Sequence, residues 1–319
     1  MNRKLYWPLL AVEAAALAAL CFTGAIDGSP LPLVTAVPWA QIAALLRTLS
    51  LGGGVGNAVA IVLYVLICLL PLLALGLIRR RRRWAAEDAM LAALSALLFW
   101  GLYTLINPGR LAAVYGATLE RVAIGLVIWG MLVGYGLLRL TRALFSGEEK
   151  HLWRAAAVVL WVLAALFVYG AFGDSLAELL AAIRSMRESN TGAEAGTLLG
   201  SEALLIVQYL VKILPDVLNV WVIAAMGKLL RPMAQAPYSA QSAEVADALA
   251  RRCGVAVAVT VVSQLVMALV QLGLAGSVLK LNVALSVPLD AMAFTLVALV
   301  LVQLIRRGKA LQDDNDLFV

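Results

Sequence analysis

The sequence predicts an all-α fold, a polytopic transmembrane bundle of about eight helices built from two parallel four-helix repeats. Of its 319 residues, 63% are hydrophobic and 14% are charged, and the mean hydropathy is +0.93. Soluble domains carry roughly 45–50% apolar and about 25% charged residues, so this composition cannot cover a water-facing surface. Eight apolar runs of membrane-spanning length and an alternation of basic and base-poor loops complete the prediction.

Each of the eight runs approaches or exceeds the roughly 20 residues that cross about 30 Å of hydrocarbon. They occupy residues 6–26, 57–78, 88–106, 118–138, 155–173, 203–227, 253–275 and 283–305. The first run is interpreted as a retained helix, because it is longer than the apolar core of a signal peptide and contains Glu13. A cleaved signal peptide stays open as the alternative, since Arg3 and Lys4 form a short basic start.

Lysine and arginine are concentrated in alternate loops. With the N-terminus inside, the cytoplasmic side receives the basic residues of segments 3–4, 79–83, 139–154, 228–252 and 306–309, and the outer side holds Arg47, Arg110, Arg121, Arg184, Arg187 and Lys280. This distribution follows the positive-inside rule and predicts a bacterial cytoplasmic membrane protein with both termini in the cytoplasm. The net charge of +6 then needs no nucleic-acid partner.

A run of five arginines directly follows the second apolar run. It consists of Arg79, Arg80, Arg81, Arg82 and Arg83. In a soluble protein such a run would suggest nucleic-acid binding, but beside a membrane span it orients the helix and contacts anionic lipid headgroups. The sequence therefore predicts a lipid-facing cytoplasmic patch and no nucleic-acid partner.

Four sequence similarities recur in the same order in the two halves. Residues 39–49 match residues 176–186, and the Tyr64 and Pro71 pair matches Tyr209 and Pro215. A basic cytoplasmic end then follows in each half, and both halves close with a basic and then an acidic segment. Parallel repeats of this kind are related by an axis along the membrane normal. The expected domains are residues 1–150 and residues 151–319, each a four-helix transmembrane repeat.

Three segments outside the apolar runs carry amphipathic helical patterns. Segments 38–50 and 174–189 each predict a short helix that lies on the outer membrane surface or packs on the ends of its own bundle. On the cytoplasmic side, an amphipathic helix is expected to begin after Ser239 and to precede the seventh span, with Arg251 and Arg252 closing it.

The C-terminal part also carries a loop sequence, PYSAQSAEVADAL, and a tail sequence, RGKALQDDNDL. With them, residues 228–319 resemble an uncharacterised bacterial family of small four-helix membrane proteins with a basic-Gly-x-x-Leu-Gln-acidic tail, commonly encoded beside small phage-repressor-like regulators. The resemblance is faint in the first half. It implies a duplicated unit, since this chain is about twice as long, and it supplies no catalytic residues.

Motifs of enzymes and cofactor sites are missing from the sequence, which has no nucleophile elbow, phosphate-binding loop or HExxH pattern. The lone His151 is interpreted as a solvated loop residue, and the three cysteines lack metal or disulfide spacing. We therefore expect no enzymatic activity, no cofactor and no metal. A sparse carboxylate site acting on lipids stays open as the alternative.

The sixth apolar run contains an unexpected polar stretch, IVQYLVKILPDVLNV, at residues 206–220. Lys212 and Asp216 are four residues apart and share a helix face, and Pro215 leaves the carbonyl of Val211 without its helical partner. A charge in the bilayer centre costs at least about 2.5–3.5 kcal/mol, so these groups should face protein, water or each other. We expect Lys212 to be neutralised by Asp216, by Asp290, or by both.

Other polar residues of neighbouring spans complete a candidate intramembrane polar cluster. Its members are Lys212, Pro215, Asp216, Gln264, Gln271 and Asp290. The cluster serves either as a structural clamp or as a binding site, and the residues alone leave both open.

Two functional classes fit these features. A single polar cluster without a lined pathway favours a non-enzymatic regulatory or interaction protein, which contacts membrane lipids and meets a protein partner through its cytoplasmic loops or tail, with an oligomer possible. The alternative is a small-solute or ion transporter or channel with a midplane site at Lys212, Asp216 and Asp290. A cavity that reaches Lys212 would favour this alternative.

Overall fold

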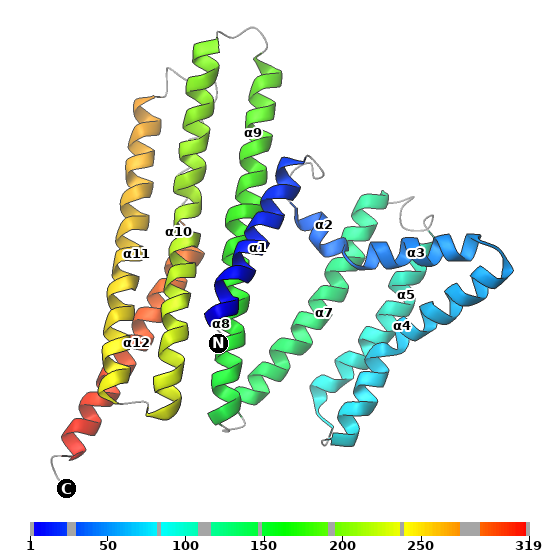
Figure 1. Ribbon diagram of the computed structural model, residues 1–319, viewed down its shortest axis with the longest axis horizontal. Helices are drawn as coiled ribbons and strands as arrows, with labels where there is room; N and C mark the ends of the chain where they lie inside the picture. Colours follow the sequence, from blue (N-terminus) through cyan, green and yellow to red (C-terminus); the bar gives the residue numbers. More distant parts are fainter. Residues whose placement is uncertain are drawn as a thin grey trace. The chain divides into compact units, whose positions relative to one another are not determined.

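The computed structural model describes residues 3–23, 30–81, 84–107, 116–145, 149–190, 195–236, 239–274 and 288–316 (Figure 1). All regular elements in these ranges are helices. Eight stretches of them are long and apolar enough to cross a membrane, from Leu5–Phe22 to Leu289–Asp314. The predicted all-α polytopic fold is confirmed, and the chain is a multi-pass membrane protein.

Contacts divide the chain into two compact units. Unit 1 contains Met1–Pro30 and Glu149–Val319, and unit 2 contains Leu31–Glu148. The first helix, α1 (Arg3–Phe22), therefore packs with the C-terminal part of the chain. The domain expected over residues 1–150 included this helix and so differs from unit 2, because hydropathy locates a span but does not show which other spans it contacts.

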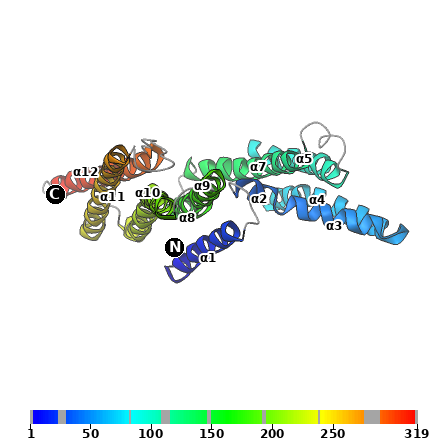
Figure 2. The same cartoon turned by 90° about the horizontal axis from the view of Figure 1, so that it is seen from above.

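Unit 1 is built around two very long helices. The helix α8 (Glu149–Tyr169) continues through a π-helical turn, η2 (Gly170–Asp174), into α9 (Ser175–Ser189), as Figure 1 shows. Beside it runs α10 (Ala195–Gln235), followed by α11 (Ala240–Gly273) and α12 (Leu289–Asp316). From above, α1 lies to one side of the α8–α9 rod (Figure 2), which it contacts.

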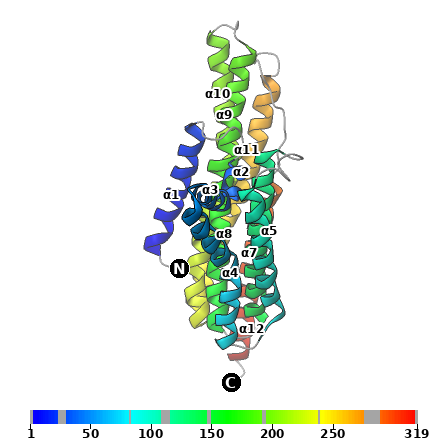
Figure 3. The ribbon, with the colours of Figure 1, turned by 90° about the vertical axis from the view of Figure 1, so that its right-hand side faces the viewer.

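These two rods are longer than a bilayer is thick. The 41 residues of α10 extend about 62 Å at 1.5 Å per residue, roughly twice the 30 Å hydrocarbon core. Residues 174–189 do not lie apart on the membrane surface, because α9 continues the fifth span through η2 and packs along α10 and α1 within unit 1. This excludes the first of the two positions expected for this segment and is closer to the second. Figure 3 shows α9 and α10 running side by side, with α1 inclined to them.

The core of unit 1 has two parts that share α10. One part joins α10, α11 and α12 through Val222, Leu249 and Val302. The other joins α1, α8 and α10 through Tyr6, Ala164 and Ile223. Small residues such as Ala164 and Ala298 allow the helix backbones to approach closely, which is how membrane helices gain packing energy.

The predicted helix start at Ser239 is confirmed. Its side chain accepts a hydrogen bond from the Ser242 backbone N–H at 3.2 Å and so satisfies one of the unpaired donors of the first turn of α11. The amphipathic segment and the seventh span form one continuous helix of 34 residues, which the sequence did not indicate.

Unit 2 contains α2 (Leu31–Ala36), α3 (Trp39–Leu51), α4 (Gly54–Arg81), the short 3₁₀ helix η1 (Ala86–Asp88), α5 (Ala89–Ile106) and α7 (Ala117–Phe145). Leu98, Leu102 and Ile128 form its core with Cys68 of α4. Contacts of α3 with α4, α5 and α7 place it across their ends (Figure 1), which is one of the two positions expected for segment 38–50.

The backbone of α2 rests directly on α7. A Cβ atom at Gly125 would lie 2.7 Å from the Thr35 carbonyl carbon, a separation that real Cβ atoms do not show. One turn further along α7, Trp129 Nε1 donates to the Val37 carbonyl oxygen at 3.0 Å. At the end of α2, the Thr35 carbonyl thus packs against Gly125 of α7, and the Val37 carbonyl accepts a hydrogen bond from the Trp129 indole N–H.

The predicted arginine patch lies at the end of α4. Arg79 and Arg80 are exposed there, and the Arg79 guanidinium lies 5.5 Å from the Trp84 ring centroid. Nearby, Arg142 of α7 pairs with Glu87 at 2.6 Å. The side chain of Arg81 and the whole of Arg82 and Arg83 lie outside the described residues, so lipid binding by this patch stays a prediction.

Candidate functional site

A π-helical turn sets the direction of α9 and so builds one wall of the candidate site. The carbonyls of η2 accept hydrogen bonds from neighbouring helices: Tyr209 Oη donates to Ala171 at 3.4 Å, and Cys21 Sγ lies 3.7 Å from the Gly173 oxygen. After this turn, Ser175, Glu178 and Ala182 follow at helical spacing and face α10. Such π turns commonly occur at functional sites.

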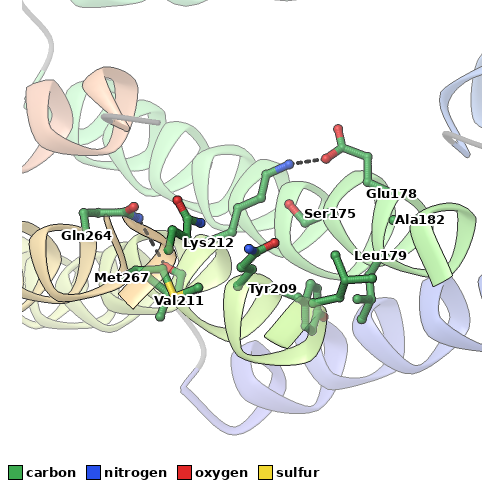
Figure 4. A pocket seen from close by; sticks show the side chains of 12 residues that line it. Ser175, Glu178, Leu179, Ala182, Tyr209, Val211, Lys212, Gln264 and Met267 are labelled. Atoms are coloured by element: carbon green, nitrogen blue, oxygen red, sulfur yellow. Dashed lines mark hydrogen bonds and ion pairs between the residues drawn. The ribbon is translucent and has the colours of Figure 1, made fainter. Parts of the chain in front are cut away.

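These α9 residues line a polar cavity of about 260 Å³ together with α10 and α11 (Figure 4). From α10 come Gln208, Tyr209 and Lys212, and from α11 come Gln264, Met267 and Gln271. At roughly 30 Å³ per water molecule, the cavity has room for about nine waters or for a solute of similar size. Lys212, Gln264 and Gln271 of the predicted polar cluster therefore meet at one site.

Lys212 has a different partner from the one predicted. Its Nζ forms an ion pair with Glu178 Oε2 of α9, drawn as a dashed line in Figure 4, and not with Asp216 or Asp290. The Lys212 side chain is 45% exposed and that of Glu178 is 67% exposed. The pair therefore lies in an open cavity, and neither charge is locked in the core.

The Val211 carbonyl, which Pro215 was predicted to leave without its helical donor, has another hydrogen-bond donor in the structure. Proline lacks an N–H and so leaves the Val211 carbonyl without its helical donor. Gln264 Nε2 of α11 lies 3.3 Å from this oxygen and supplies the missing hydrogen bond. In unit 2, Ser95 Oγ of α5 donates to the Cys68 carbonyl at 2.6 Å, next to the Ile67 carbonyl that Pro71 leaves without a helical donor.

Of the remaining glutamines in the cavity wall, Gln208 has unused hydrogen-bonding capacity. Gln271 is buried at 6% exposure and lines the cavity wall. The Nε2 atom of Gln208 is buried and has no hydrogen-bond partner within the described ranges. A buried amide donor without a partner costs free energy, which a ligand oxygen in the cavity would recover.

The two predicted aspartates lie elsewhere. Asp216 packs against α8 and η2, because a Cβ at Gly170 would lie 3.3 Å from its Oδ2 atom, and it lines a separate apolar crevice with Trp7 and Val217. Asp290 is exposed in the first turn of α12. Neither aspartate lines the polar cavity, but Asp216 interacts electrostatically with both Asp290 and Lys212, so the predicted cluster is only partly divided.

Sequence reasoning missed two polar groups. Glu178 was considered only as part of a surface helix, since the continuity of α8 with α9 has no sequence signal. Asn219 of α10 is 1% exposed, and its Nδ2 donates to the Ala291 carbonyl at 3.2 Å while its Oδ1 accepts from Thr295 Oγ1 at 2.9 Å. A signal for Asn219 was present, because it lies one helical turn after Pro215.

The cavity lies far from the basic end of unit 1. Lys212 is 16 residues, or about 24 Å, from Lys228 on the same helix, and Asn219 is nine residues, or about 14 Å, from it. With Lys228 at the edge of a core about 30 Å thick, Asn219 would lie near the middle and Lys212 near the opposite edge. The buried Asn219–Thr295 pair lies between Lys212 and the basic end of α10, and the midplane position of Lys212 stays a prediction.

No protein-family model, curated protein or solved structure matches this chain. The resemblance of residues 228–319 to a four-helix family, and the duplication that it implies, therefore stay predictions.

Proposed function

We propose that the protein is a transporter of a small zwitterionic solute, which it binds in the cavity between α9, α10 and α11. The observation that carries this proposal is the Lys212–Glu178 pair in an open polar cavity. An exposed ion pair contributes only about 0–1 kcal/mol to stability, so it is a poor clamp. The same pair offers one positive and one negative group to a solute that carries both charges.

The other cavity residues support the same class of ligand. Gln208 has a buried donor without a partner among the described residues, and Gln271 and Ser175 add polar groups on the two flanking helices. A solute carboxylate accepts hydrogen bonds from Lys212 and Gln208, and a solute ammonium donates to Glu178. A cavity of about 260 Å³ has room for a solute such as a small amino acid or betaine.

The helix α10 also contains a proline at which it can bend to open the cavity towards the basic end. Pro215 lies between Lys212 and the buried Asn219, so the helix can bend at the level between the cavity and the closed midplane layer. Broken helices beside a solute site are a recurring feature of secondary transporters. Passage of the solute then requires Asn219 and Thr295 to separate.

We expect zwitterionic solutes to raise the melting temperature of the wild-type protein purified in detergent. A ligand at one hundred times its Kd stabilises the native state by about 2.7 kcal/mol. Lys212→Met and Glu178→Gln should each abolish this shift, while the unfolding free energy without solute falls by less than about 1 kcal/mol, because the pair is exposed. The panel contains small zwitterions, carboxylates and amines, each at millimolar concentration.

A second ion pair between the same helices provides the control. Arg187 and Glu202 also join α9 to α10, with distances of 2.5 and 2.9 Å, but neither lines the cavity. Arg187→Gln should keep the wild-type response. Equal responses in Lys212→Met and the wild type, or no response to any class, would contradict solute binding and favour the regulatory or interaction protein. Binding without uptake into proteoliposomes would contradict transport alone.

A further inference from the structure

A second cavity lies at the basic end of unit 1, where α1, α10 and α11 meet. Its volume is about 400 Å³, and its wall includes Tyr6 and Trp7 of α1, Trp221, Lys228 and Arg231 of α10, and Arg252 of α11. None of these residues lines the polar cavity around Lys212. The two cavities are therefore separate sites on the same unit.

The charged side chains in the described wall of this second cavity are all cationic. Three cationic side chains line it, and no carboxylate is among the described residues of its wall. Arg252 is half-buried with its guanidinium 5.0 Å from the Trp221 ring centroid, a cation–π contact that holds the guanidinium at the cavity. A phosphate oxygen accepts strong charge-assisted hydrogen bonds from such groups.

Tyr6 adds an unused hydroxyl to the wall. The residue is 1% exposed, and its Oη is buried with no hydrogen-bond partner in the described part of the chain. Its ring is held edge-on against Trp7 and Trp161, with centroid distances of 5.2 and 6.0 Å. A buried phenol that lacks a partner is unusual, and a ligand oxygen in the cavity would satisfy it.

The basic cavity continues into an apolar crevice of about 610 Å³. Trp7 and Trp221 line both, and the crevice then follows Leu10 and Ala14 of α1, Phe167 of α8 and Val217 of α10. Asp216 closes the deep end, 12 residues or about 18 Å from Lys228 along α10. The crevice is therefore slightly deeper than half of a 30 Å hydrocarbon core, which is the depth that a single acyl chain occupies.

We propose that unit 1 holds an anionic phospholipid, with its phosphate between Lys228, Arg231 and Arg252 and one acyl chain in the crevice between α1 and α10. The head cavity supplies the charge preference, and the crevice supplies the affinity for a chain. A free phosphate contacts only the head cavity and not the crevice. The lipid joins α1 to α10, so it also stabilises the association of the first helix with the rest of unit 1.

The test measures lipid binding to the full-length protein in detergent by native mass spectrometry. The probes are phosphatidylglycerol, phosphatidylcholine with the same acyl chains, and inorganic phosphate. We expect phosphatidylglycerol to bind at least about tenfold more tightly than phosphatidylcholine, and Arg231→Gln with Arg252→Gln to remove this preference, since each surface cation contributes on the order of a fivefold change. Ala11→Trp, which fills the crevice, should weaken both lipids and leave their ratio unchanged.

The matched control is Arg251→Gln. Arg251 is exposed next to Arg252 on α11 but does not line the cavity, so its loss should leave the preference at the wild-type value. Equal binding of the two lipids by the wild type would overturn the proposal. So would a preference that survives the double variant or that Arg251→Gln removes equally, and inorganic phosphate binding as tightly as phosphatidylglycerol would overturn the role of the crevice.

Discussion

Gly125→Ala is expected to destabilise unit 2 by about 3 kcal/mol. The new Cβ would lie 2.7 Å from the Thr35 carbonyl carbon and 3.2 Å from the Ala36 backbone nitrogen. Backbone atoms cannot rotate away as a flexible side chain does, so α2 must move away from α7, and overpacking of this kind costs about 1–3 kcal/mol or more. The movement also lengthens the hydrogen bond from Trp129 to the Val37 carbonyl, which is 3.0 Å in the wild type.

Chemical unfolding in mixed micelles, followed by circular dichroism, measures this loss. Gly130→Ala is the control, because Gly130 lies in the same helix and its Cβ would meet no atom within 4 Å. Alanine there should be neutral or stabilising by about 0.5–1 kcal/mol, as expected for glycine replaced inside a helix. Equal unfolding midpoints for the two variants would show that α2 does not rest on α7 at Gly125.

Asn219→Asp should be the most damaging single change in the middle of unit 1. The wild-type amide donates to Ala291 and accepts from Thr295, and the residue is 1% exposed. Aspartate keeps the shape but loses the donor and places a carboxylate near the Ala291 carbonyl oxygen. A charge at this depth costs at least about 2.5–3.5 kcal/mol, so we expect a loss of about 3 kcal/mol or more.

Two further variants separate the effect of the new charge from the effect of the lost hydrogen bonds and from that of the substitution itself. Asn219→Leu removes the hydrogen bonds without adding a charge and should cost about 1–2 kcal/mol, since Thr295 keeps its bond of 3.0 Å to Ala291 within α12. Asn57→Asp makes the same chemical change at an exposed asparagine in the first turn of α4 and should be close to neutral. The unfolding midpoint should therefore be highest for Asn57→Asp, lower for Asn219→Leu and lowest for Asn219→Asp. An Asn219→Asp midpoint as high as that of Asn57→Asp would show that residue 219 is not sealed from water.

The spans were predictable from the sequence because a bilayer imposes a length and a composition on every crossing helix. Their lateral partners were not, since spans that are apolar on all sides carry no marked contact face. The helix α1 illustrates this: its sequence gives the span, but its packing on α8 depends on Tyr6 and Leu10 fitting against Leu160 and Ala164. Such shape complementarity depends on both helix surfaces, so the sequence of one helix does not reveal its partner.

Features of the site that follow from a backbone rule were predictable from the sequence. Features that depend on a side chain far away in the sequence were not. Pro215 necessarily frees the Val211 carbonyl, and Gln264 was correctly placed among the polar groups of the neighbouring span. The direct ion-pair partner of Lys212 was missed, because only carboxylates inside apolar runs were considered. Glu178 lies 34 residues earlier, beyond a π turn that extends the fifth span towards it.

The central claim is that a water-filled cavity reaches Gln264 and Lys212 between the helices. Its most direct test compares the rates at which a hydrophilic thiol reagent labels Gln264→Cys and Leu265→Cys in lipid nanodiscs, with the buried Cys21, Cys68 and Cys253 replaced by alanine. Gln264 lines the cavity, whereas its neighbour Leu265 is 56% exposed without lining it and so faces lipid at the same depth. The account predicts fast labelling of Gln264→Cys, slowed by a bound zwitterionic solute, and little labelling of Leu265→Cys. Equal slow labelling at both positions would contradict it.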